Sequence, residues 1–155
     1  MRFVPHLPRN DLLAAFPPDA FSRISPHLEP IDLPCGAVLY EPGTHLDFVY
    51  FPTSAVLSLL HVMERGTSPE IAVVGHEGVV GISFALAGEA AFSKAVVKGA
   101  GACYRVQGAA LRGQFELGGP TMYLLLRYTQ ALVTQIAKTA ECHRIHPLDQ
   151  QLCRW

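Results

Sequence analysis

The stretch "AVLYEPGTHLDFVYFPTSAVLSLL", residues 37–60, decides which fold we expect for this chain. Its valine, leucine and aromatic residues stand in short runs, which Pro42-Gly43 and Pro52-Thr53-Ser54 separate. Short runs of this composition between turn-forming residues are typical of β-strands joined by tight turns. The stretch therefore predicts a series of short strands.

The same pattern continues on the C-terminal side of this stretch. "ERGTSP" (64–69) predicts a hairpin turn into the strand "EIAVVG" (70–75), and Gly99-Ala100-Gly101 divides residues 94–107 into two further strands. Many short strands at regular spacing, with glycine and proline turns between them, are typical of a β-barrel or jelly roll. We expect a β-roll of about eight strands.

Short helices are predicted before the strands. Asn10 can cap a helix in "DLLAAF" (11–16), which Pro17-Pro18 would end. Asp19 can start a second helix in "AFSRISPHL" (20–28) in the same way. Helices and strands in separate parts of the chain indicate the α+β class.

A long helix is predicted after the strands, because residues 121–146 contain neither glycine nor proline. A helix of this length measures about 39 Å, which is more than a small barrel requires. Its apolar residues at helical spacing are Leu125, Tyr128, Leu132, Ile136 and Ala140. This face predicts a seam with a second copy of the chain. The alternative is that the face covers the chain's own barrel.

Length and composition fit one compact unit with a tail. The chain has 155 residues, of which 50% are hydrophobic, and its formal net charge is -1. No general basic field is therefore expected to attract nucleic acid. We divide the chain into helices and β-roll (1–120), the long helix (121–146) and the start of a further helix after Pro147 (147–155).

The expected setting is the cytoplasm. No apolar run reaches the roughly 18 residues of a membrane span, and the N-terminus lacks the apolar core of a secretory signal. Cys35, Cys103, Cys142 and Cys153 are scattered, without a Cys-x-x-Cys pair. A disulfide framework is therefore not expected.

Three segments in this order resemble a known family. They are "LPCGAVLYEPGTHLDFVYFPTSAV" (33–56, with Gly36, Gly43 and Tyr50), "GHEGVVG" (75–81, with Gly78 and Gly81) and the helix that runs into "HPLDQQLCRW" (146–155). Together they cover nearly the whole chain. The set resembles the sensor half of bacterial transcription regulators of the Crp/Fnr type.

The resemblance implies a fold, a function and partners. The fold would be a cyclic-nucleotide-binding-type jelly roll, and the long helix would pair with its twin in a homodimer. A winged helix-turn-helix domain would follow and bind DNA. Residues 147–155 would be its truncated start, with the remainder missing beyond Trp155. The function expected for this chain is effector sensing and dimerisation in transcription regulation.

The resemblance also identifies a candidate ligand pocket. Family members that bind cyclic AMP carry Gly-Glu at the start of a phosphate cassette and Arg-Ser near its end. Here Ile82 follows Gly81, and the later segment reads Phe92-Ser93-Lys94, without an arginine. Ser93 can keep the serine's role, and Lys94 or Lys98 can supply a positive charge, although not a guanidinium fork. The candidate residues are Gly78, Gly81, Ile82, Ser83, Ser93 and Lys94.

The effector remains open at this point. The alternatives are ordinary cyclic AMP binding, a different small ligand or none, and an unusual mode of nucleotide binding. A runner-up function is a degenerate module that only dimerises or docks onto another protein.

An enzyme, a cofactor and a metal site are not expected. A cupin-like metal enzyme is a weaker alternative, because "GTHLDFVYF" (43–51) offers a single histidine where cupins need a cluster. Cys142, His143 and His146 lie near the end of the long helix, but no further metal ligand accompanies them.

Overall fold

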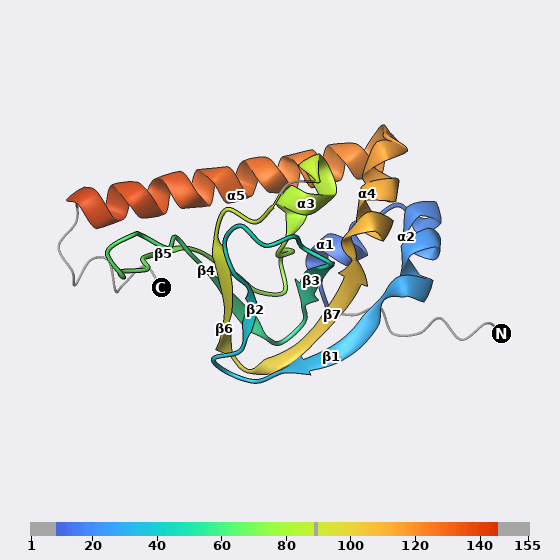
Figure 1. Ribbon diagram of the computed structural model, residues 1–155. Coiled ribbons are helices and arrows are strands. Elements are labelled where there is room, and N and C mark those ends of the chain that lie inside the picture. Colours follow the sequence, from blue (N-terminus) through green and yellow to red (C-terminus); the bar gives the residue numbers. More distant parts are fainter. Residues whose placement is uncertain (1–8, 89, 146–155) are drawn as a thin grey trace.

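The computed structural model describes residues 9–88 and 90–145 of the chain (Figure 1). The predicted start of a further helix in residues 147–155 lies outside the described residues. The strands are β1 (Glu29–Leu33), β2 (Val38–Tyr40), β3 (Phe48–Pro52), β4 (Val56–Leu60), β5 (Glu70–Val74), β6 (Lys94–Gly99) and β7 (Gly101–Gln107). The helices are α1 (Asp11–Ala14), α2 (Pro18–Ile24), α3 (Ile82–Ala87), α4 (Gly108–Glu116) and α5 (Gly119–Ile145), with a short 3-10 turn, η1 (Ser25–His27), after α2.

The strands form two antiparallel sheets that make a roll. One sheet has the order β1-β7-β3 and the other has the order β2-β6-β4-β5. Among the described residues there are seven strands, where the sequence predicted about eight. The predicted α+β jelly roll with short N-terminal helices and a long C-terminal helix is confirmed.

Two large apolar cores hold the layers of the described residues together, and a smaller third cluster contains Leu46, Phe84 and Ala91. The first lies between the β1-β7-β3 sheet and the helices, and includes Phe16 of the N-terminal segment, Phe51 of β3 and Leu111 of α4. The second lies between the two sheets, where Leu57 and Val74 meet Cys103 of β7. In Figure 1, α1, α2 and α4 gather at one end of the roll, and α5 runs along its length.

The buried side chain of Asn10 fixes the start of the N-terminal helices. Its Oδ1 atom accepts a hydrogen bond from the backbone N–H of Leu13 at 3.0 Å, which confirms the predicted cap. Its Nδ2 atom donates to the backbone oxygens of Pro52 and Gly78, both at 2.8 Å. One amide therefore joins α1 to the end of β3 and to the turn after β5.

Two helices were not predicted. α3 lies inside the glycine-rich stretch, between Gly81 and Gly88, and both glycines have positive φ angles of 97° and 68°. α4 begins at Gly108 without a side-chain cap and contains a second glycine, Gly113. Neither helix has a side-chain cap that would mark its start in the sequence, and the glycines at or within the two helices lower helix propensity.

Candidate functional site

The predicted cassette, which is the segment that contains the candidate residues from Gly78 to Lys94, begins with a turn that is followed by α3. Val80 pairs with Tyr50 of β3 through two backbone hydrogen bonds of 2.8 and 2.9 Å. Gly81 then turns the chain with its positive φ, and a Cβ atom there would lie 3.1 Å from Cγ1 of Val49. The close approach to β3 and the left-handed conformation together explain the glycine.

Ile82 occupies the place of the family's ribose-binding glutamate. Its side chain is 5% exposed and belongs to the core beneath the helices. Ser83 is half-buried beside it. An apolar side chain that packs into the core has no hydrogen-bonding group to offer a ribose hydroxyl.

The two neighbouring residues near the end of the cassette, Phe92 and Ser93, differ in their exposure to solvent. Phe92, next to the serine, is 58% exposed, whereas Ser93 is buried. The Ser93 side chain hydrogen-bonds the hydroxyl group of Tyr40, and burial raises the pKa of that hydroxyl to about 12. Ser93 is therefore already bound to a neighbouring strand.

Both candidate lysines have acidic partners. Lys94 Nζ lies 3.3 Å from Glu41 Oε1, and Lys98 Nζ lies 3.1 Å from Glu70 Oε1. Glu70 also accepts a hydrogen bond from Ser58 of β4. A phosphate at this cassette would have to compete with two carboxylates for its cations.

The turn before the cassette contacts α5 directly. The Tyr128 hydroxyl donates a hydrogen bond to the backbone oxygen of Val79 at 2.9 Å. Gly78 leaves room for this ring, because a Cβ atom there would lie 2.7 Å from Tyr128 Cε2. Burial raises the pKa of the Tyr128 hydroxyl to about 12. The fit between Gly78 and Tyr128 joins two residues that the sequence analysis had assigned to separate roles.

The predicted seam residues face mostly inward. Leu125 has no exposed surface and lies in the core, while Leu132 and Ile136 pack on the core between the sheets. Because Leu125 is buried and Tyr128 is hydrogen-bonded to its own chain, the structure corrects the seam at these two positions. Ala140 is exposed. The alternative reading, in which this face covers the chain's own barrel, describes the inward-facing residues.

An apolar row lies on the outer face of α5. Tyr123, Leu126 and Val133 are 65%, 43% and 53% exposed, and Ala137 and Ala140 continue the row towards the end of the helix. Their spacings of three, seven, four and three residues follow a heptad pattern. The exposed Gln130 occupies the heptad position between Leu126 and Val133. Of this row the sequence analysis named only Ala140, because the row lies next to the inward-facing one.

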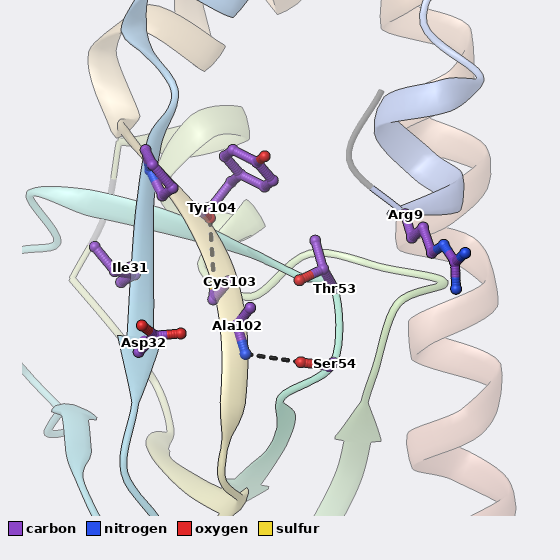
Figure 2. Close-up of a pocket in the computed structure, with 9 residues that line it drawn as sticks. Arg9, Ile31, Asp32, Thr53, Ser54, Ala102, Cys103 and Tyr104 are labelled. Atoms are coloured by element: carbon purple, nitrogen blue, oxygen red, sulfur yellow. Dashed lines mark hydrogen bonds between the residues drawn. The ribbon is translucent and has the colours of Figure 1, made fainter. Parts of the chain in front are cut away.

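A cavity of about 600 Å³, which none of the candidate cassette residues lines, lies at the β1–β7 side of the roll (Figure 2). Residues of β1, of β7 and of the turn after β3 line it, together with Arg9 before α1. Asp32, Thr53, Ser54 and Tyr104 are among these residues. The sequence analysis did not find this cavity, because its walls come from four separate segments.

The described residues contain no group of three or more His, Cys, Asp and Glu side chains that could hold a metal ion. Cys142 is buried, and His146 lies outside the described part. None of the helices in the described ranges is long and apolar enough to cross a membrane.

Neither a protein-family model nor a curated protein matches the sequence. Solved structures do match the fold. The c-di-GMP responsive global regulator CLP from Xanthomonas campestris has a TM-score of 0.71 at 12% identity, with 88% of this chain and 69% of that chain covered. The sensor domain of the transcriptional regulator DNR from Pseudomonas aeruginosa has a TM-score of 0.63 at 15% identity, with 92% of each chain covered.

The chain has the cyclic-nucleotide-binding-type jelly-roll fold. The regulatory domain of Toxoplasma gondii PKA, solved with cAMP, shares it with a TM-score of 0.60 at 13% identity, over 69% of this chain. The chain spans 41% of that protein and 69% of the Xanthomonas regulator. The structural neighbours are thus regulators of the Crp/Fnr type and cyclic-nucleotide-binding domains, as the sequence resemblance implied.

Proposed function

We propose that this chain is the effector-sensing and dimerisation domain of a cytoplasmic, Crp/Fnr-like bacterial transcription regulator, and that its effector is not a standard cyclic nucleotide. The claim about the effector rests on the two cassette positions that would bind a cyclic nucleotide. Ile82 lies in the core where the glutamate would stand, and Phe92 points to solvent where an arginine is expected.

The electrostatics of the cassette support this proposal. A phosphate taken out of water requires a cationic partner with hydrogen-bond donors. Lys94 is paired with Glu41 and Lys98 with Glu70. Breaking either pair to bind a phosphate would leave a carboxylate beside the bound anion, and like charges at short range oppose binding.

The contact between the cassette turn and α5 supports a sensing role. Tyr128 of α5 fills the space over Gly78 and hydrogen-bonds Val79. A ligand that moves this turn therefore acts on α5 through the ring and the hydroxyl. In the parent regulator, α5 would pass the shift to a DNA-binding domain that follows it.

The proposed partner in dimerisation is a second copy of the chain, bound through the outer face of α5. The row from Tyr123 to Ala140 has the heptad spacing of a two-helix seam, and it ends on two alanines that permit close helix approach. DNA binding is proposed for the parent protein only.

Thermal unfolding of the chain with cyclic AMP, cyclic GMP and cyclic di-GMP tests the effector assignment. A ligand at about 100 times its Kd stabilises a protein by about 2.7 kcal/mol, which raises the Tm measurably. We expect no change with the three nucleotides. A saturable rise in Tm with one of them would overturn the assignment and would indicate binding through backbone N–H groups and lysine.

A second candidate function is a module that only dimerises or docks onto another protein. The ion pairs of Lys94 and Lys98 favour it, because they leave the cassette neutralised without a ligand. Native mass spectrometry of the gently purified chain separates the two candidates. A retained small molecule supports sensing, and a bare dimer mass supports the second candidate.

A further inference from the structure

The cavity in Figure 2 carries opposite charges on two sides. Asp32 of β1 and Arg9 before α1 lie on opposite sides of Thr53, Ser54 and Ala102. At least five carboxylates of the described residues have a lysine or arginine nitrogen within 4.0 Å, as Glu29 has Arg105. Asp32 and Arg9 have no such partner within residues 9–88 and 90–145. As far as residues 9–88 and 90–145 go, no opposite charge within 4.0 Å competes with a ligand for either group.

The floor of this cavity is held firmly. The backbone N–H groups of Thr53, Ser54 and Ala55 donate to the backbone oxygen of Ala102 at 3.0, 3.1 and 3.1 Å. Ser54 Oγ accepts a hydrogen bond from the N–H of Ala102 at 2.8 Å. The buried Asn10 ties the neighbouring Pro52 to the start of α1, next to Arg9. A site on such a floor is preformed, so little binding free energy is lost in ordering the protein around a ligand.

The walls combine hydroxyl groups with apolar surface. Thr53 and Ser54 bring hydroxyl groups to one side, and Pro30, Ile31 and Tyr104 provide apolar surface on the other. The volume of about 600 Å³ falls within the range of roughly 300–1,000 Å³ that is typical of small-molecule sites. In Figure 2 the guanidinium group of Arg9 points away from Thr53. Arg9 is exposed, and exposed side chains change rotamer within nanoseconds, so a ligand in the cavity would bind Arg9 after a rotamer change.

The span from Asp32 to the turn at Thr53, on whose other side Arg9 lies in Figure 2, sets the length of the ligand. Asp32 lies opposite Ala102 in the β1–β7 ladder, and the turn at Thr53 bonds the same residue. Two strand spacings of about 4.8 Å therefore separate Asp32 from the turn, or about 10 Å in all. Three extended residues cover about 10 Å. We propose that this cavity binds a free peptide of about three residues, with its ammonium group at Asp32 and its carboxylate at Arg9.

Isothermal titration of the full chain with tri-alanine tests the proposal. Two blocked forms, N-acetyl-tri-alanine and tri-alanine amide, each remove one terminal charge. We expect tri-alanine to bind and each blocked form to bind about tenfold or more weakly, since charge-assisted hydrogen bonds are the strong ones. Asp32→Asn should weaken tri-alanine about tenfold and leave the N-acetyl form unchanged. Arg9→Gln should likewise weaken the binding of tri-alanine about tenfold and leave the affinity for tri-alanine amide unchanged.

The matched controls are Glu64→Gln and Arg65→Gln, which remove exposed charges from the β4–β5 turn. They should leave tri-alanine binding as it is. The proposal is overturned if tri-alanine does not bind at millimolar concentration, or if it binds with equal affinity to the wild type and to both cavity variants. None of these results depends on the cassette, so the proposed function is tested separately.

Discussion

A Cβ atom on Gly78 would lie 2.7 Å from Cε2 of Tyr128, so the turn after β5 and helix α5 fit together only because residue 78 is glycine. The Tyr128 hydroxyl reaches past this glycine to the backbone oxygen of Val79. A movement of the turn and a movement of α5 are therefore coupled by steric contact and by one hydrogen bond.

Gly78→Ala should destabilise the chain by about 1–3 kcal/mol, since the added methyl group overlaps a ring that is packed on the core. Urea unfolding measures the loss. The double variant with Tyr128→Ala should lose less than the sum of the two single variants, because the clash is absent without the ring.

Gly113→Ala is the matched control for this prediction. A Cβ atom at Gly113 meets nothing within 4 Å, and the residue lies inside α4. Alanine there should stabilise the chain by about 0.5–1 kcal/mol. Equal free energies of unfolding for the wild type and for Gly78→Ala would contradict the coupling.

Restoring the family's glutamate should not restore nucleotide binding. Ile82→Glu places a carboxylate in an apolar core and should cost roughly 2–5 kcal/mol of stability in urea unfolding. Phe92→Arg is the control at an exposed position and should stay within about 0.5 kcal/mol of the wild type. An Ile82→Glu chain that keeps its stability would show that this side chain is not confined to the core.

The roll was predictable because its turns are marked by residues with special backbone preferences, such as Pro42-Gly43 and Pro52-Thr53-Ser54. α4 was not, since neither Gln107 nor Gly108 supplies a side-chain cap. The sequence itself shows that the cassette lacks the glutamate and the arginine, because Ile82 and Phe92 stand at these positions. The pairing of Lys94 with Glu41 could not be read from the sequence, because Lys94 begins β6 and Glu41 follows β2, and the two residues are distant in sequence.

The seam shows a different limit of sequence analysis. α5 carries two neighbouring apolar rows, one through Leu125 and Leu132 and one through Leu126 and Val133. Periodicity identifies both rows as apolar, but only the packing on the roll distinguishes the row that is already covered.

Alkaline pH should destabilise the chain through its buried phenols. Burial raises the pKa of Tyr40 and of Tyr128 from 10.0 to about 12. Because the folded-state pKa lies above the unfolded value, each neutral phenol contributes to the free energy of unfolding. This contribution is fully present below pH 10.0 and is lost as the pH rises to about 12. Urea unfolding measures the loss when it is carried out at about pH 9.5, below this window, and at about pH 11.5, within it. Tyr128→Phe should show a smaller loss between the two values; an equal loss would contradict the role of this phenol.

The outer row of α5 gives the last prediction. Val133→Glu should convert the proposed dimer to a monomer and leave the free energy of unfolding of the monomer nearly unchanged, because the side chain is 53% exposed. Light scattering after size-exclusion chromatography gives the mass. Leu125→Ala, on the inner row, should instead cost about 2–5 kcal/mol of stability, since Leu125 is fully buried in the core. A Val133→Glu chain that keeps the dimer mass would place the dimer contact on another surface, and a wild-type chain that is monomeric at all concentrations would remove the dimer from the proposed function.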